Sequence, residues 1–104
     1  MELDKEIEWS EKISGELRSV RRNEFRMWIE YYQQNGLEPA LEFARRLSQS
    51  RMLRPKQKRA FGTIFYGIRK YKHDLGSMAS ETVSHIFGYM IWELHIRRKR
   101  GESK

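Results

Sequence analysis

Hydrophobic residues recur at spacings of three and four along most of this chain, which predicts helices rather than strands. In the first such segment, residues 4–34, the stripe consists of Ile13, Leu17, Val20, Glu24, Met27 and Tyr31, widened by Phe25, Trp28, Ile29 and Tyr32. Gly15 and the polar run at 21–23 can interrupt it, since Gly costs about 1 kcal/mol relative to Ala inside a helix. We expect one long helix or two short ones.

Two further helices are marked by glycine and proline. Asn35-Gly36 is a stop signal, and Pro39 fits the first position of a second helix of about ten residues that ends at 48–50. Pro55 starts a third helix that is expected to run to about His73, with Gly76 closing the segment. The inward residues are expected to be Leu37, Leu41, Ala44 and Leu47 in the second helix, and Ala60, Phe61, Ile64, Phe65, Ile68, Tyr71 and Leu75 in the third.

The last helix is expected to start at a serine cap, Ser77 or Ser80, and to fray in the basic end of the chain. Trp92 falls beside its inward face, so we interpret it as a core residue, whereas Trp9 lies in an acidic stretch where an exposed indole would suggest a protein contact. The expected inward residues are Val83, Ile86, Phe87, Met90, Ile91 and Leu94.

These segments predict an all-α fold, a compact bundle of four to five helices. We expect a single helical domain over residues 1–96, followed by a basic, frayed C-terminal tail over 97–104. The chain has no cysteine, which excludes disulfides, thiolate zinc sites and cysteine nucleophiles. No apolar run is long enough for a bilayer and the N-terminus is acidic, so we expect a soluble, cytoplasmic protein without a secretory signal.

Charge is distributed unevenly along the 104 residues, whose formal net charge is +7. Residues 1–20 contain three basic and six acidic side chains, whereas residues 55–74 contain six basic and one acidic. Such a balance favours an anionic partner, either a nucleic acid or an acidic protein surface.

The positive charge of the third helix forms a stripe opposite its apolar face. Arg59, Gly62, Tyr66, Arg69 and His73 recur at three- and four-residue spacings, flanked by Lys56, Thr63 and Lys70. Cations for phosphates, a small residue for close approach and an aromatic ring for base stacking are what a nucleic-acid strand needs. The alternative is an ordinary solvated helix face, but no Asp or Glu interrupts the stripe before Asp74.

We therefore predict phosphate contacts at Lys56, Arg59, Arg69 and Lys70, extended by Arg45, Arg46 and Arg54, with Tyr66 and His73 on the same face. Arg97 and Arg98 are a second candidate contact, or simply cations that complement the end of a helix. No catalytic residues, metal ligands or cofactor are expected. The three histidines are not spaced for a helical metal clamp, and no glycine-rich phosphate loop occurs.

Residues 35–43, Asn-Gly-Leu followed by Leu-x-Phe, resemble a segment of the small all-helical subunits of type III CRISPR effector complexes. This resemblance implies a non-catalytic RNA-binding subunit of an antiviral defense ribonucleoprotein, one that stabilises guide RNA with its target or the displaced strand. It further implies contacts with other subunits and head-to-tail copies of itself.

The expected partner is single-stranded nucleic acid or the backbone of an RNA-DNA or RNA-RNA duplex. From the residues alone, only a basic helical module with phosphate contacts is expected, and RNA is not distinguished from DNA. Two alternatives stay open: a protein-protein adaptor whose basic face docks an acidic partner, and a small DNA-binding regulator. Binding to any nucleic-acid strand that weakens steeply with salt and does not depend on base sequence would distinguish a backbone-binding subunit from both alternatives.

Overall fold

The computed structural model describes the backbone of residues 2–102 and the side chains of residues 2–94. Within this range the chain is all-α, as predicted, and contains no strand. Its elements are α1 (Leu3–Ser14), the 3₁₀ helix η1 (Gly15–Leu17), α2 (Arg22–Asn35), α3 (Leu37–Ser48), α4 (Pro55–Arg69), α5 (Lys72–Gly76) and α6 (Ser80–Glu102). The described residues thus form six α-helices, where the sequence predicted four to five.

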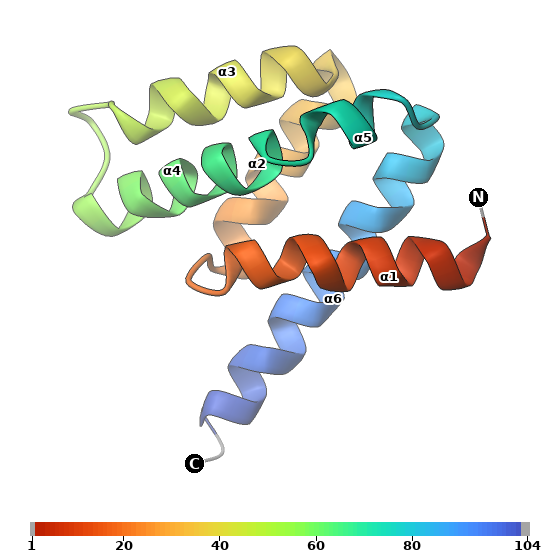
Figure 1. Cartoon of the computed structure of the whole chain (residues 1–104). Helices are drawn as coiled ribbons and strands as arrows, with labels where there is room; N and C mark the ends of the chain where they lie inside the picture. The colour runs from red at the N-terminus through yellow and green to blue at the C-terminus, as the bar shows by residue number, and fades with distance from the viewer. Residues whose placement is uncertain (1, 103–104) are drawn as a thin grey trace.

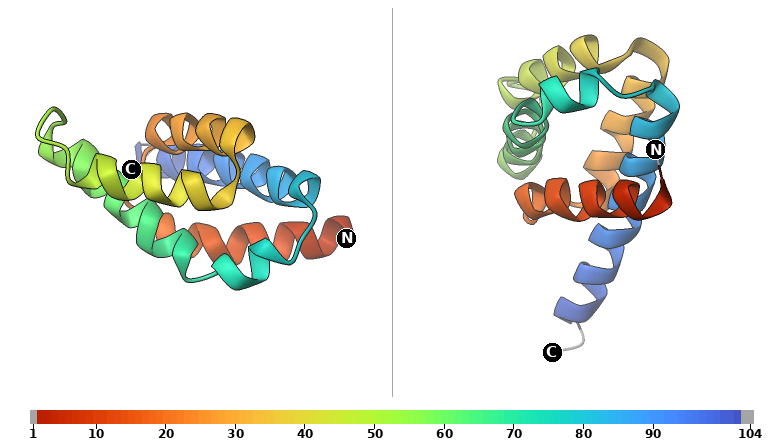
Figure 2. Two further views of the ribbon diagram at one scale, coloured as in Figure 1. Left: turned by 90° about the horizontal axis from the view of Figure 1, so that it is seen from above. Right: turned by 45° about the vertical axis from the view of Figure 1, so that its right-hand side comes forward.

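The helices pack as a flattened body of 40 × 38 × 20 Å. α3 and α4 lie side by side as a hairpin, α5 follows α4, and α1 crosses α6 (Figure 1). α2 packs between α3 and α6, and η1 contacts α4. The right-hand view of Figure 2 shows α6 as a long helix that continues past the crossing with α1. None of the described helices is long and apolar enough to cross a membrane.

An aromatic cluster occupies the centre of the core. Trp28 is fully buried, stacks on Phe25 and Tyr32, and meets the ring of Phe87 edge to face at 5.3 Å. Its indole nitrogen donates a 2.7 Å hydrogen bond to the Ala40 carbonyl, so the polar edge of the indole is satisfied as burial requires. The side chain of Trp28 thus joins α2, α3 and α6 at one point.

The first segment is two helices, because η1 and residues 18–21 separate α1 from α2. Ile13, Leu17 and Val20 are buried as predicted, but the stripe does not continue in the same phase. Met27 is 51% exposed, and the buried face of α2 is Phe25, Trp28, Ile29 and Tyr32. The break resets the helical phase, so the stripe predicted across it does not fit α2. The prediction that Met27 points inward was wrong, and the side chains of Glu24 and Tyr31 are only half-buried.

Gly36 alone connects α2 to α3. Its φ of 89° is in the left-handed region, where glycine has no steric penalty, and its N–H donates to the Tyr32 carbonyl at 2.8 Å. The helix stop at Gly36 is therefore confirmed. α3 begins at Leu37, which places Pro39 third in the helix rather than first. A proline is tolerated there because the first N–H groups of a helix have no intrahelical partner.

The third predicted helix ends early, at Arg69, and α5 continues after a break of two residues. Tyr71 and Leu75 are nevertheless buried, as the periodicity predicted. α6 begins at Ser80 directly after Ala79, whose carbonyl accepts from the N–H of Val83, so neither candidate serine occupies the cap position. The hydroxyl of Ser77 instead donates to the Asp74 carbonyl in α5.

The two tryptophans outside the core cluster differ in burial, and the interpretation of Trp92 as a core residue was wrong. Trp92 is 65% exposed rather than buried. Trp9 is half-buried, because its ring packs edge to face on Tyr71 at 6.0 Å and Lys12 Nζ lies 4.8 Å from its centroid. The α6 backbone extends to Glu102, so residues 97–102 of the expected frayed tail are helical.

Candidate nucleic-acid interface

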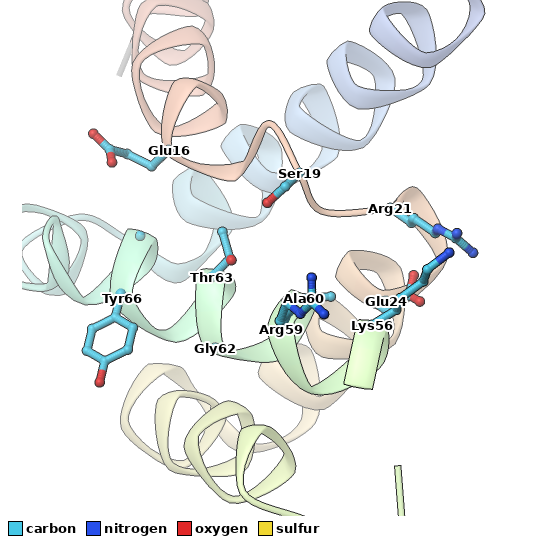
Figure 3. A pocket seen from close by; sticks show the side chains of 11 residues that line it. Glu16, Ser19, Arg21, Glu24, Lys56, Arg59, Ala60, Gly62, Thr63 and Tyr66 are labelled. Carbon is cyan, nitrogen blue, oxygen red and sulfur yellow. The ribbon is translucent and has the colours of Figure 1, made fainter. Parts of the chain in front are cut away.

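A hollow lies between α4 and the segment that connects α1 to α2. We call it the α4 groove; it has a volume of about 620 Å³ and is shown in Figure 3. Its lining residues are Glu16, Ser19, Arg21, Glu24, Lys56, Arg59, Ala60, Gly62, Thr63, Tyr66 and Gly67. A second hollow of about 570 Å³ around the start of α4 shares four of these residues and adds Arg54. The two hollows therefore form one continuous surface.

Helical periodicity places the α4 side chains in the groove. Lys56, Arg59, Thr63 and Tyr66 are three or four residues apart, so they follow one another along a single face. Pro55 sets the first helical residue, and the backbone N–H of Arg54 donates to the side-chain oxygen of Gln57 at 3.2 Å. Half of a capping box thus fixes the start of the helix, since an arginine side chain has no acceptor to supply the other half.

Gly67 allows the opposite wall of the groove to approach α4. A Cβ added at Gly67 would lie 2.8 Å from Leu17 Cδ2 and 3.2 Å from Glu16 Cβ, both closer than normal contacts. η1 therefore packs directly on the helix backbone. By contrast, a Cβ at Gly62 would meet Ser48 Cβ at an ordinary 3.6 Å. The small residue at position 62 was expected to admit a strand, but it also lies against α3.

Four exposed cations converge at the N-terminal end of the α4 groove, and they come from two elements. Arg54, Lys56 and Arg59 belong to the start of α4, and Arg21 is the residue that precedes α2. None of the four forms an ion pair with a carboxylate in the described part of the chain. Glu24 lies beside them, and one of its carboxylate oxygens is buried without a hydrogen-bond partner.

The C-terminal end of α4 is different, because a carboxylate from another element meets its lysine. Glu16 Oε1 accepts a hydrogen bond from Lys70 Nζ at 2.8 Å, which raises the pKa of Lys70 above its ordinary value. In α5, Lys72 Nζ lies 2.6 Å from Glu38 Oε1. The basic stripe contains no acidic residue in the sequence before Asp74. In the fold, however, carboxylates from α3 and η1 pair with the lysines at its C-terminal end.

The two arginines of α3 share one carboxylate partner. Arg45 and Arg46 both donate to Glu42, through a close two-pronged contact from Arg45 and a 3.2 Å bond from Arg46 Nε. These bonds, with that from Arg45 the larger cause, lower the pKa of Glu42 from 4.5 to about 2. A phosphate approaching this face meets a bound carboxylate between the two guanidinium groups.

Two further predicted residues lie outside the α4 groove. The Arg69 guanidinium carbon is 5.6 Å from the centre of the Phe65 ring, and the side chain lines a separate hollow with Glu38 and Glu42. His73 belongs to α5 and lines another hollow beside the start of α3. The stripe was predicted for one continuous helix that runs to about His73, and the break after Arg69 ends it.

The structure therefore brings together Lys56, Arg59 and Tyr66 in the α4 groove, with Arg54 adjoining, and separates them from Arg45, Arg46, Arg69, Lys70 and His73. The side chains of Arg97 and Arg98 lie outside those that the structure describes. Sequence reasoning missed Arg21 as a site residue. The Arg21-Arg22-Asn23 run was visible only as an interruption of a helix, and nothing local indicated that it faces α4.

Comparison with known proteins gave no match to a family model, to a curated protein or to a solved structure.

Proposed function

We propose that this chain is a non-catalytic subunit that binds the phosphate backbone of a nucleic acid at the N-terminal end of the α4 groove. The observation that carries the proposal is the convergence there of Arg21, Arg54, Lys56 and Arg59, exposed and free of ion pairs within the described structure. Arginine is the cation best suited to phosphate, since its planar fork donates two parallel hydrogen bonds.

The placement of these charges costs stability, which supports a binding role. The N-terminus of a helix carries a partial positive charge, so a cation there is unfavourable by about 0.3–1 kcal/mol. The first turn of α4 contains no acidic residue and begins Arg54-Pro55-Lys56. Each of the other described helices has an acidic residue in its first turn. An anion bound at the start of α4 would relieve this repulsion and interact favourably with the dipole.

Backbone contacts of this kind carry no sequence information. Binding is therefore expected to be indifferent to sequence and steeply weakened by salt, because each neutralised phosphate releases counterions. A sequence-specific regulator would instead prefer one duplex over others.

The resemblance of residues 35–43 to small subunits of type III CRISPR effector complexes supports membership of a larger cytoplasmic ribonucleoprotein. In such a complex the chemistry would belong to other subunits. The acidic helix α1, with Asp4, Glu8 and Glu11 exposed, would face a basic neighbour, either another subunit or the next copy of this chain. Purification of the tagged full chain from its native cells, followed by identification of bound RNA and proteins, tests this membership.

The direct test compares two double variants with the same loss of charge. Fluorescence anisotropy would measure binding of the wild-type chain, of Lys56→Ala with Arg59→Ala, and of Lys70→Ala with Lys72→Ala, to a labelled single strand at several salt concentrations. The first variant removes two unpaired cations from the groove, so we expect affinity to fall by about tenfold or more and the salt slope to decrease by about 1.4. The second removes cations that Glu16 and Glu38 already neutralise and should change both quantities much less.

Equal losses in the two variants would show that binding depends on net charge alone and would contradict a site at the α4 groove. If the wild-type chain binds no polyanion even at low salt, the nucleic-acid function is wrong and an acidic protein partner becomes the hypothesis to test.

A further inference from the structure

The two ends of the α4 groove differ in chemistry. The cations Arg21, Lys56 and Arg59 lie toward one end, and Tyr66 lies toward the other with Glu16 (Figure 3). Arg59 and Tyr66 are seven residues apart on one helix face, a distance of about 10 Å along the axis at roughly 1.5 Å per residue. A ligand that fills the groove must therefore match positive charge at one end and an aromatic ring at the other.

Tyr66 is available for such a contact. Its side chain is 69% exposed, and its one described ring neighbour is Phe65, which meets it edge to face at 5.2 Å. An exposed aromatic ring beside a line of cations is the arrangement on which bases of single strands stack. The charges of Glu16 and Lys70 offset each other at this end, and the cations that line the groove lie at the other end, which leaves the base as the part of a nucleotide that fits here.

We infer that the α4 groove binds a single-stranded segment, with its phosphates on Arg21, Lys56 and Arg59 and an unpaired base stacked on Tyr66. This inference rests on the proposed function. The span of about 10 Å corresponds to at most three nucleotides of a stacked strand, which rises about 3.4 Å per nucleotide. The groove volume of about 620 Å³ lies in the range of sites that hold small ligands, roughly 300–1,000 Å³.

Stacking on Tyr66 requires an exposed base face, which a continuous duplex offers only at its ends. The same chain should therefore prefer single strands to duplex of equal length at equal salt. This preference distinguishes the inference from binding to phosphates alone, because duplex DNA has the higher density of phosphate charge.

The experiment uses the full chain and two short labelled single strands. One strand is intact, and in the other every nucleotide is replaced by an abasic one, so that only the sugar-phosphate backbone remains. Tyr66→Ala is compared with Tyr66→Phe, which keeps the ring, and thermal unfolding verifies that both variants are folded. We expect Tyr66→Ala to weaken binding of the intact strand about 5- to 150-fold, the range for losing one stacked base. Binding of the abasic strand should be unchanged, and Tyr66→Phe should behave as wild type.

Equal binding of intact and abasic strands by the wild-type chain, with no effect of Tyr66→Ala, would overturn the inference while leaving the phosphate-binding function in place. Failure of the wild-type chain to bind either strand would overturn both. A wild-type preference for duplex over the single strand would also contradict the stacked base.

Discussion

The two halves of the outer face of α4 have the same kinds of residue and opposite electrostatic environments. In the N-terminal half, Lys56 and Arg59 are joined by Arg21, which precedes α2, and have no carboxylate partner in the described structure. In the C-terminal half, Lys70 is bonded to Glu16, and the following lysine, Lys72, to Glu38. The difference shows that the fold can pair the cations in one part of a sequence and leave those in another part unpaired.

The largest expected effect comes from removing this difference. Replacing Glu16, Glu38 and Glu42 together by glutamine would free the four cations that they bind, which are Arg45, Arg46, Lys70 and Lys72. We expect affinity for a single strand at low salt to rise by on the order of 100-fold, with a steeper salt dependence, because each released cation can contact a phosphate. Anisotropy titrations at stepped salt concentrations measure both. An unchanged salt slope would show that these four cations do not contact the phosphates of the strand even when they are unpaired.

The second prediction concerns the packing that brings Glu16 onto α4. Gly67→Ala inserts a methyl group 2.8 Å from Leu17, which is fully buried and cannot move aside freely. Such overpacking costs about 1–3 kcal/mol. After the gain of about 1 kcal/mol in helix propensity, we expect the net change to lower the midpoint of thermal unfolding by several degrees.

Gly62→Ala is the matched control for this substitution. It lies on the same helix, and its added Cβ meets Ser48 at a normal contact distance. We expect an unchanged or slightly higher unfolding midpoint by circular dichroism, because the propensity gain is not opposed by a clash. Equal unfolding midpoints for the two glycine variants would show that η1 can shift away from a Cβ at position 67 at little cost in stability.

The smallest expected effect is the pH dependence of the Glu42 contacts. The folded-state pKa of Glu42 is lowered from 4.5 to about 2, so its stabilising contribution is present above pH 4.5 and is lost as the pH falls toward 2. Glu42→Gln should therefore be slightly less stable than wild type near neutral pH and should lose this difference at pH 2. Thermal unfolding at both pH values tests it.

Glu30→Gln is a suitable comparison, because Glu30 lies 4.0 Å from Arg26 at a more exposed i,i+4 position without a close hydrogen bond. A wild-type advantage over Glu42→Gln that persists unchanged to pH 2 would contradict the assigned cause.

Periodicity predicted the helices and much of the core because both are local properties. The buried faces of α4 and α6, including Ile64, Ile68 and Met90, follow directly from spacings of three and four. The same reasoning failed for Met27, because the break before α2 rotates the next helix and a stripe read across the break loses its phase.

The electrostatic state of the candidate site was not predictable in this way. Glu42 lies three and four residues before Arg45 and Arg46, so that neutralisation has a local signal that was overlooked. Glu16 and Lys70, in contrast, meet only through tertiary packing, and so do Arg21 and the start of α4. The sequence identified half of the groove, and the fold selected which cations remain unpaired.

The Lys70–Glu16 contact joins residues that are 54 positions apart in the chain. It can form only after η1 has docked on α4, whereas the cations themselves are present as soon as α4 is made. An incompletely folded chain therefore exposes more unpaired positive charge than the native protein does. Completion of folding should thus reduce indiscriminate attraction to cellular polyanions, and refolding in the presence of RNA is expected to be slower than refolding without it.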